Sequence, residues 1–383
     1  MVYVFALALV RHYTAMNVLV PKIGDCVKDM DKKYACWITV NRQCNLRCEW
    51  CYAKQSKYEQ KSNLSADTFD DLLGIAKSMN VTHLTLVGGE PTLYKDLEYV
   101  ITKSHKLSIS CGIVSNGVRF ASREYTSRLK KTGVDCIGLS LKGFSKDSFI
   151  YTTGKDHYTN CMNAIRNIQR IKIPFIVSMV LTPNNIDRFL FGVRDAINNG
   201  AEYFSFSFEF NFDNNSHYSM NECFKLFRLV YGFCKQYDEL CALTNNQFSL
   251  HQTLPLCIWN MEFLLKMKEK QQLYTTCQLL QKNGLIFNTN GDLLVCNALY
   301  NYPIARYGVD FHDANDFKQT LESKSINSIY NKLCALPSNK CIDCSLWQQC
   351  GGGCVSNWCH YSLEELLYYY KVFKNSLDDN YYI

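Results

Sequence analysis

The sequence predicts an α/β fold: six parallel strands in a partial (β/α)6 barrel, similar to an incomplete TIM barrel, followed by a cysteine-rich C-terminal domain. Strand-like apolar runs alternate with amphipathic helical segments at intervals of about 30 residues, and this alternation favours parallel strands with right-handed crossovers. The 20 cysteines of the 383-residue chain fall into groups, the largest of them near the C-terminal end. A chain of this length has room for one large and one smaller domain.

The barrel elements follow one another from residue 36. Residues 36–40 predict a first strand, and residues 65–79 predict a helix with Ser65 as its cap, acids in the first turn and helical apolar spacing. Further strands are expected at 84–87, 109–114, 136–141, 175–181 and 203–210, and further helices at 96–105, 121–132, 157–171 and 185–199. The active site of such a barrel lies at the C-terminal ends of its strands.

The remaining segments are less regular. Helices are expected at 223–240 and 258–270, a loop between them at NNQFSLHQTLP (245–255), a hairpin around 291–296 and an amphipathic helix in the tail. We divide the chain into an N-terminal extension (1–35), a barrel core (36–212), a bridging region (213–270), a cysteine-rich domain (271–360) and a C-terminal helix (361–383). The apolar start, MVYVFALALV, is too short to span a bilayer and predicts a first strand or a short pairing segment.

Composition excludes several classes of partner. The net charge of +6 is mild, and the basic residues are scattered, so neither a nucleic acid nor a membrane partner is expected. Twenty cysteines in a chain this long, grouped as ligands would be, indicate metal binding in a reducing compartment and not a disulfide framework. We therefore expect a cytoplasmic protein.

One short loop carries the strongest chemical signal. CNLRCEWCYA places Cys44, Cys48 and Cys51 directly after the first predicted strand. Thiolates are the usual ligands of a 4Fe–4S cluster, and three of them hold three irons and leave the fourth open to a small molecule. A zinc site would usually add a fourth Cys or His at finger spacing, and the nearest histidines, His12 and His83, are far along the chain.

The spacing of this loop resembles that of the radical S-adenosylmethionine (SAM) enzymes, and Trp50 supplies the aromatic residue common before the third cysteine. The resemblance implies SAM on the open iron and a 5′-deoxyadenosyl radical that abstracts hydrogen from a substrate. It also implies a reductant such as flavodoxin or ferredoxin. The segment HLTLVGGEPTL (83–93) matches the family's GGEP motif, which receives the amino group of SAM. By resemblance this role passes to Gly88, Gly89 and Glu90.

Polar residues at later strand ends are the other candidates for SAM contacts. Asn116 follows the third strand, Ser140 and Lys142 end the fourth, and Thr182 and Asn185 follow the fifth. In the resembled family such positions contact the ribose, the carboxylate and the adenine. Asn116 is equally well explained as a turn residue, because Asn-Gly is a common turn. Ser140 is preferred over Lys142, which is also explained as an exposed base.

The C-terminal cysteines resemble a SPASM extension, which carries two auxiliary 4Fe–4S clusters, and so complete the expected fold class as an iron–sulfur cluster domain. The resemblance assigns Cys277, Cys296 and Cys354 to one cluster and Cys341, Cys344 and Cys350 to the other. Cys359 is the only later cysteine available as the last ligand of the second cluster, with Cys334 as a rival, and Cys257 is a candidate for the first. Two structural zincs remain the alternative. The ten cysteines outside these groups and Cys359, which include Cys257 and Cys334, are mostly expected to be small buried apolar groups.

The resemblance implies a radical SAM enzyme, an oxidoreductase that acts on a peptide or protein, most often as a maturase of a ribosomally made peptide. Only 43 residues precede Cys44, too few for the leader-binding domain of many such enzymes, so a separate leader-binding protein is a possible partner. The alternatives are a formylglycine-forming sulfatase activator, disfavoured because Asn297 stands where an acid usually follows the cysteine, a small-molecule radical SAM dehydrogenase, and a non-catalytic metal-binding protein.

Overall fold

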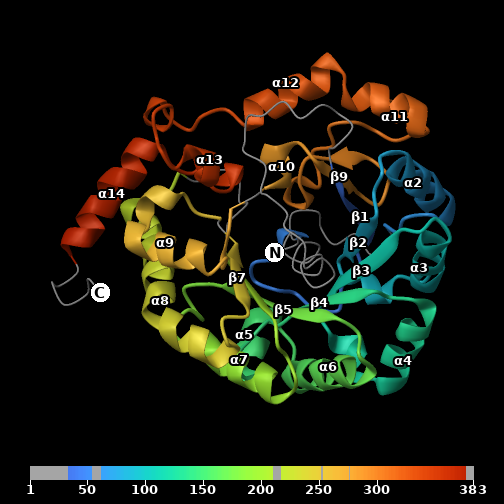
Figure 1. Cartoon of the computed structure of the whole chain (residues 1–383), viewed down its shortest axis with the longest axis horizontal. Coiled ribbons are helices and arrows are strands. Elements are labelled where there is room, and N and C mark those ends of the chain that lie inside the picture. The colour runs from blue at the N-terminus through green and yellow to red at the C-terminus, as the bar shows by residue number, and fades with distance from the viewer. Residues whose placement is uncertain (1–32, 54–61, 210–216, 252, 276, 377–383) are drawn as a thin grey trace.

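The protein folds around one curved, ten-stranded sheet. The computed structural model describes residues 33–53, 62–209, 217–251, 253–275 and 277–376. The sheet has the strand order β10-β9-β1-β2-β3-β4-β5-β6-β7-β8, and neighbouring strands from β1 to β8 run parallel. Helices cover its outer side (Figure 1). The predicted partial barrel is confirmed. The segment expected to pair at residues 1–10, with His12 and Cys26, lies outside the described residues.

The six predicted strands are all present within a few residues of their expected bounds. They are β1 (Ala35–Asn41), β2 (His83–Gly88), β3 (Ser110–Ser115), β4 (Cys136–Ser140), β5 (Phe175–Leu181) and β6 (Phe204–Phe208). Between them lie α2 (Ala66–Ser78), α3 (Leu97–Lys106), α4 (Arg123–Thr132), α6 (Tyr158–Ile171) and α7 (Phe189–Asn198). Ser65 caps α2 as expected, since its side chain accepts a hydrogen bond from Thr68 N.

Side chains alternate between the two faces of each strand. On β1, Ile38 packs into the large core between sheet and helices, whereas Trp37 lies in a small inner cluster with Val87 and Ile176. Because both faces of the strands are covered, even polar side chains near the strand ends are buried, among them Thr39, Ser115 and Ser140. Because packing covers both faces of the sheet, the strand ends that carry the candidate site are held in fixed positions.

Several elements were not predicted from the sequence, among them α5, β8 and the helices α10 to α13, and one prediction was wrong. Helix α5 (Lys146–Thr153) lies between β4 and α6, and a short strand β8 (Leu273–Tyr274) follows α9. Residues 245–255 were expected to form a loop, but they contain the strand β7 (Phe248–His251), which pairs with β6. Its Asn-rich start is a real turn, since Asn245 and Asn246 have positive φ, and the strand begins directly after it. Burial against β6 and α8 favours a strand where the local composition favoured a loop.

The C-terminal half returns to the first strand. After α8 (Met220–Thr244), α9 (Met261–Glu269) and α10 (Gln278–Gln281), β9 (Gly284–Phe287) pairs parallel with β1, and β10 (Leu293–Leu294) pairs antiparallel with β9 as the predicted hairpin. The chain continues through α11 (Ala314–Leu321), α12 (Lys324–Leu333), α13 (Trp347–Cys350) and α14 (Leu363–Asn375), which run from α11 beside α2 to α14 beside α8 (Figure 1). The predicted tail helix is therefore present.

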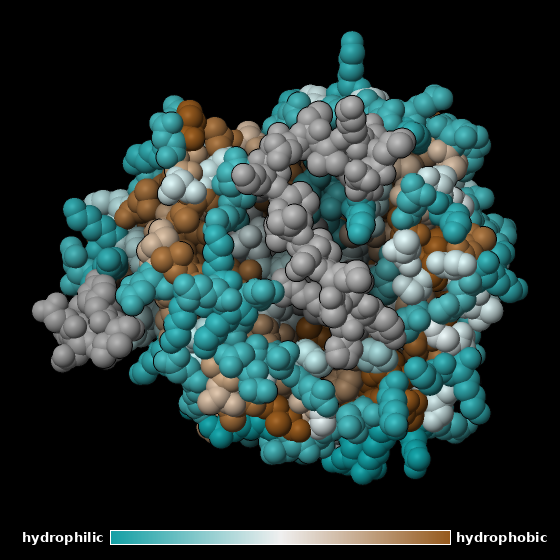
Figure 2. All heavy atoms as spheres, in the orientation of Figure 1, coloured by the Kyte–Doolittle hydropathy of each residue, from teal (hydrophilic) through white to brown (hydrophobic). Residues whose placement is uncertain are grey.

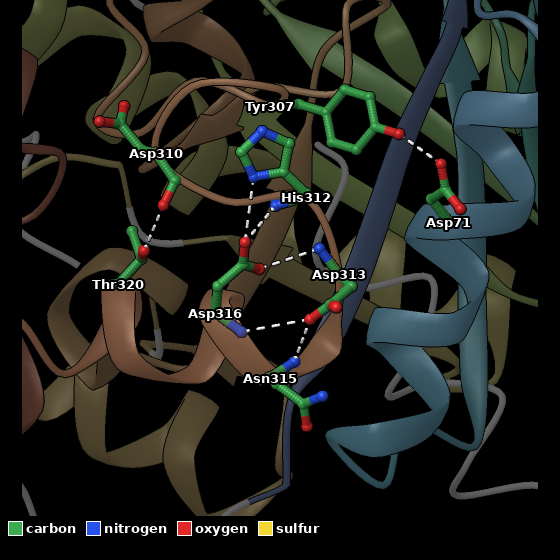
Figure 3. Close-up of polar contacts among 8 residues, drawn as sticks. All are labelled: Asp71, Tyr307, Asp310, His312, Asp313, Asn315, Asp316 and Thr320. Atoms are coloured by element: carbon green, nitrogen blue, oxygen red, sulfur yellow. Dashed lines mark hydrogen bonds and ion pairs between the residues drawn. The ribbon is translucent and has the colours of Figure 1, made fainter.

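Side-chain contacts fasten this half to the barrel. Figure 3 shows the hydroxyl of Tyr307 donating to Asp71 on α2, and Asp313 capping α11 by accepting from the backbone N–H groups of Asn315 and Asp316. Gly291 lies close by with φ of 86°, and a Cβ there would stand 2.8 Å from Thr68 Cγ2. The hairpin thus rests directly on α2, and it carries Cys296 toward the barrel.

The surface is mixed in character. The face drawn in Figure 2 is largely hydrophilic, with smaller hydrophobic areas between. Among the helices of the described part of the chain, none has the length and apolarity needed to cross a bilayer.

Candidate metal and cofactor site

The three-cysteine loop leaves β1 and is held in place by α5. Arg47 N donates to Thr153 O at 3.1 Å and Glu49 N donates to Thr152 O at 2.9 Å, so the last turn of the helix supplies acceptors for the middle of the loop. The side chain of Arg47 donates to Cys44 O at 2.8 Å. The helix that the sequence did not predict therefore positions the three thiols.

The thiols of this loop lie together. Cys48 is buried and Cys44 and Cys51 are half-buried. Burial raises the pKa of Cys44 to about 12, the Leu46 N–H lowers it, and Glu90, Cys48 and Cys51 raise it further. Leu46 N lies 3.4 Å from Cys44 Sγ. These thiols lose their protons when a metal binds, and the amide hydrogen bond then stabilises a coordinated thiolate.

The two glycines of the GGEP motif allow β1 and β2 to approach at their ends. A Cβ on Gly88 would stand 2.3 Å from Asn41 Oδ1, and one on Gly89 would stand 2.4 Å from the carbonyl oxygens of Arg42 and Gln43. Neither glycine is among the residues with positive φ. Their role here is close approach of backbone to backbone, which brings the motif against the cysteine loop.

The Glu90 carboxylate accepts four hydrogen bonds from protein donors. Its Oε1 accepts from Thr92 N at 3.1 Å, Thr92 Oγ1 at 2.6 Å and Ser115 Oγ at 2.8 Å, and its Oε2 accepts from Asn116 N at 2.7 Å. Glu90 O accepts from Asn41 Nδ2 at 3.0 Å. The buried side chain therefore ties the end of β2 to the end of β3, and the backbone of Glu90 adds the link to β1.

Asn116 links the third strand to the cysteine loop. Its Nδ2 donates to Asn45 Oδ1 at 2.7 Å, and its Oδ1 accepts from Val118 N at 3.1 Å. Asn116 precedes Gly117 (φ 82°), so it is also the turn residue that Asn-Gly suggests. The structure brings together the loop of Cys44, the GGEP motif and Asn116.

The other strand-end candidates lie at the same edge of the sheet. Ser140 is buried and pairs in register with Ser178, and Lys142 is close enough to Cys161 to lower the pKa of that thiol, which burial raises. Thr182 and Asn185 contact each other, since Asn185 Oδ1 accepts from Thr182 N at 2.8 Å. Asn185 also donates to Val180 O at 2.8 Å, so its amide closes the turn after β5.

Sequence reasoning missed an aromatic and cationic group beside the loop. Arg42 is buried, and its guanidinium lies 3.9 Å from the ring centroid of Tyr300 and 6.0 Å from that of Tyr52. Burial raises the pKa of Tyr52 to about 12, Arg42 lowers it, and Cys51 and Cys296 raise it. Tyr52 therefore lies near thiols of both halves of the chain. Arg42, two residues before Cys44, was the available signal.

The C-terminal thiols form two groups. Burial raises the pKa of Cys296 to about 12 and that of Cys277 to about 11, and in both cases Cys354 raises it further. Burial also raises the pKa of Cys341, and Cys350 and Cys344 add to the effect. Within each predicted triad, Cys277, Cys296, Cys354 and Cys341, Cys344, Cys350, the thiols are thus close enough to raise one another's pKa.

The three uncertain cysteines separate between these groups. Beyond the effect of burial, Cys334 raises the pKa of Cys277 and Cys359 raises the pKa of Cys354. Both cysteines therefore lie near the first triad. Cys257, which the sequence offered to the first triad, has Cys350, Cys341 and Cys344 as its electrostatic neighbours. Six of the other unassigned cysteines are buried as expected, namely Cys36, Cys111, Cys136, Cys161, Cys223 and Cys241, and Cys234 is half-buried.

The arrangement of the free thiols suits a cluster of several metal ions better than a single metal ion. Every cysteine in the described ranges is a free thiol, and no three His, Cys, Asp or Glu side chains there converge closely enough to hold a single metal ion. The cysteines of a 4Fe–4S cluster bind different irons, so they stand further apart than the ligands of one ion. Free thiols in three groups, each with a backbone N–H donating to one of its sulfurs, fit iron–sulfur clusters by their chemistry.

Residues 38–190 match the model of the radical SAM superfamily, so this part of the chain is a radical SAM domain and the resemblance of the cysteine loop is confirmed. The radical SAM family binds SAM and a 4Fe–4S cluster.

Among the curated relatives, a probable GTP 3′,8-cyclase of Thermococcus kodakarensis is 24% identical over 144 residues, 38% of this chain and 46% of that protein. The sporulation killing factor maturation protein SkfB of Bacillus subtilis is 26% identical over 170 residues, 44% of this chain and 41% of SkfB. The match thus spans less than half of each relative.

Two solved structures share the fold over most of the chain. anSMEcpe with bound AdoMet and the Cp18Cys peptide aligns over 89% of this chain and 95% of its own, with a TM-score of 0.64 and 17% identity. Streptococcus suis SuiB bound to the precursor peptide SuiA aligns over 92% and 83%, with a TM-score of 0.65 and 17% identity. The likeness covers the C-terminal half as well as the barrel.

Proposed function

We propose that this protein is a peptide-modifying radical SAM enzyme, most simply a maturase of a ribosomally made peptide. One observation carries the proposal: three separate thiol groups, of which the first lies in the radical SAM domain and the other two lie in the C-terminal half. SkfB by its name is a maturation protein, and SuiB was solved with a precursor peptide. Both support a peptide substrate.

Each part of the site would contribute one task. Cys44, Cys48 and Cys51 would hold a 4Fe–4S cluster, and that cluster with SAM supplies a 5′-deoxyadenosyl radical for hydrogen abstraction. The backbone of Gly88, Gly89 and Glu90 would receive the amino group of SAM, while the Glu90 carboxylate keeps that backbone in place. Asn116 and Ser140 would contact the rest of SAM.

The auxiliary groups would hold two further clusters. Cys277, Cys296 and Cys354 would ligate the first, and Cys341, Cys344 and Cys350 would ligate the second. All six lie in the cysteine-rich domain proposed from the sequence, residues 271–360. Tyr52 is near both Cys51 and Cys296, and Arg42 lies beside it, so a substrate would meet both thiol groups on this side of the barrel. A reductant such as flavodoxin or ferredoxin, a separate leader-binding protein and a cytoplasmic location complete the proposal.

The sulfatase-activator alternative is weakened at Asn297. The residue is buried, and its Oδ1 accepts no hydrogen bond within the described part of the chain. A carboxylate could take a proton there, whereas an amide has no basic oxygen at neutral pH. The formylglycine reaction would therefore have to find its base elsewhere.

The test uses the reconstituted protein under anaerobic conditions with SAM, a strong reductant and a short peptide encoded beside its gene. We expect 5′-deoxyadenosine to form and the peptide to change mass, with both products abolished when SAM is omitted. A sulfatase-derived peptide serves as the competing substrate. Conversion of that peptide alone would overturn the maturase proposal in favour of the activator, and absence of 5′-deoxyadenosine in every mixture would favour the non-catalytic alternative.

A further inference from the structure

The segment 253–258 lies against the cysteine-rich loop about 90 residues later in the chain. Leu256 N donates to Cys350 Sγ at 3.3 Å, and Cys354 N donates to Thr253 O at 3.0 Å. The buried side chain of Asn357 adds a second hydrogen bond to Thr253 O, at 2.6 Å from Nδ2. Three hydrogen bonds therefore fix the register between the two segments.

A glycine makes this contact possible. Gly353 has φ of 77°, and a Cβ at this position would stand 2.9 Å from Leu254 C and from Thr253 O. Any larger residue would push the two backbones apart. The close approach is therefore built into the CGGGC sequence of the loop, and it places residue 257 one position beyond a hydrogen bond to the sulfur of Cys350.

Cys257 differs from its neighbours in sequence by its exposure to solvent. Its neighbours Leu256 and Ile258 are 2% and 1% exposed, whereas Cys257 itself is exposed, as is Cys344. The buried neighbours anchor the short 3-10 turn η5 (Leu256–Ile258), and Cys257 between them remains exposed to solvent. The structural thiols of the barrel, such as Cys111, are buried. Cys257 is thus available to a ligand.

The thiols around it are those of the second auxiliary group. Although part of the residue reaches solvent, desolvation of its sulfur by the surrounding protein raises the pKa of Cys257 to about 12, and Cys350, Cys341 and Cys344 raise it further, in that order of effect. Burial raises the pKa of Cys354 in the other group, and Cys359, the last cysteine in the sequence, raises that pKa further. Cys257 is therefore an electrostatic neighbour of the three thiols that the sequence pattern assigned to the second group.

We propose that Cys257 is the fourth ligand of the second auxiliary cluster, together with Cys341, Cys344 and Cys350. This assignment rests on the proposed function, because it presupposes auxiliary iron–sulfur clusters. It closes the second cluster with a cysteine from the bridging segment before α9 and leaves no iron of that cluster free for substrate. It also frees Cys359 to lie beside the first triad. The Leu256 N–H would donate to a coordinated sulfur, an interaction that tunes cluster potentials.

The experiment compares Cys257→Ala and Cys359→Ala with wild type after anaerobic reconstitution. Wild type is expected to hold about twelve irons in three clusters. A cluster with three thiolates loses its uncovered iron on mild oxidation, so Cys257→Ala, measured with SAM on the barrel cluster, is expected to show a three-iron signal by electron paramagnetic resonance beyond any that wild type shows, and a lower iron content. The signal from the barrel cluster with SAM should persist. Cys234→Ala, a half-buried cysteine on α8, is the matched control and should behave as wild type.

Cys257→Ser protects the test against misfolding, because it keeps the size of the side chain and a weak oxygen donor. It is expected to retain the iron but to shift the reduction potential of one auxiliary cluster. The inference is overturned if both Cys257 variants keep the wild-type iron content, spectrum and potential, or if the three-iron signal arises in Cys359→Ala instead. Wild type with only about four irons would refute the auxiliary clusters of the proposed function itself, which is a separate outcome.

Discussion

The carboxylate of Glu90 accepts a hydrogen bond from the backbone N–H of Asn116, with 2.7 Å between Oε2 and N. The contact joins the end of β2 to the end of β3. Asn116 in turn donates to Asn45 within the cysteine loop. The sequence motif presents Glu90 as part of a cofactor site. Through Asn116, its side chain also links the ends of β2 and β3 to the cysteine loop.

Glu90→Gln is expected to lower the free energy of unfolding by about 2 kcal/mol, because one carboxylate oxygen becomes an amide N–H₂ group and leaves a buried donor without an acceptor. Cleavage of SAM should become slower, with a higher KM for SAM, since Asn116 and the loop lose their common anchor. Denaturant unfolding and SAM-cleavage kinetics measure the two effects.

The control for this variant is Glu98→Gln, whose partner Arg128 is at the surface, with both side chains about half exposed. An exposed ion pair contributes little, so this change should leave stability and kinetics nearly unaltered. Equal behaviour of the two variants would contradict the anchoring role of Glu90.

Gly89→Ala is expected to cost about 1–3 kcal/mol of stability, because its Cβ would overlap the carbonyl oxygens of Arg42 and Gln43. The loop should shift and hold less iron after reconstitution. Gly74→Ala on α2 is the matched control, since nothing lies within 4 Å of its added Cβ. This second change should stabilise the helix by about 0.5–1 kcal/mol. Thermal unfolding and iron analysis distinguish them, and an unchanged iron content in Gly89→Ala would count against this account.

Replacing Cys44, Cys48 and Cys51 together by alanine should abolish formation of 5′-deoxyadenosine from SAM and a strong reductant. Alanine cannot bind iron, so the cluster is lost and not merely altered in potential. Cys234→Ala provides the comparison, as a thiol outside the three groups. Undiminished 5′-deoxyadenosine in the triple variant would disprove the radical mechanism.

Cys350→Ala should spare cleavage of SAM without substrate but stop conversion of the peptide. The barrel loop does not depend on Cys350, whereas the second auxiliary group loses a ligand and Leu256 N loses its acceptor. Metal loss can unfold a domain, so the barrel cluster must first be seen intact by electron paramagnetic resonance. Wild-type turnover of peptide by a folded variant would mean that this thiol group is structural.

Local patterns in the sequence were sufficient to predict the barrel and to select the three thiols of the first candidate site. The strands from β1 to β6 alternate with amphipathic helices, and each element has a period and a length that residues close in sequence determine. The ligand spacing of Cys44, Cys48 and Cys51 is local as well. Cap residues such as Ser65 mark a helix start through a contact only three residues long.

Contacts between distant residues decided the rest. Strand β7 was hidden in a polar segment because its stability comes from pairing with β6 and not from its own composition. The anchoring of the cysteine loop by Thr152 and Thr153 and the hydrogen bonds of Glu90 to Ser115 and Asn116 have no local sequence signal. Cys257 stands in a segment with no cysteine spacing of its own. Only the tertiary fold brings it to Cys350, because hydrogen bonds across some 90 residues determine which thiols meet.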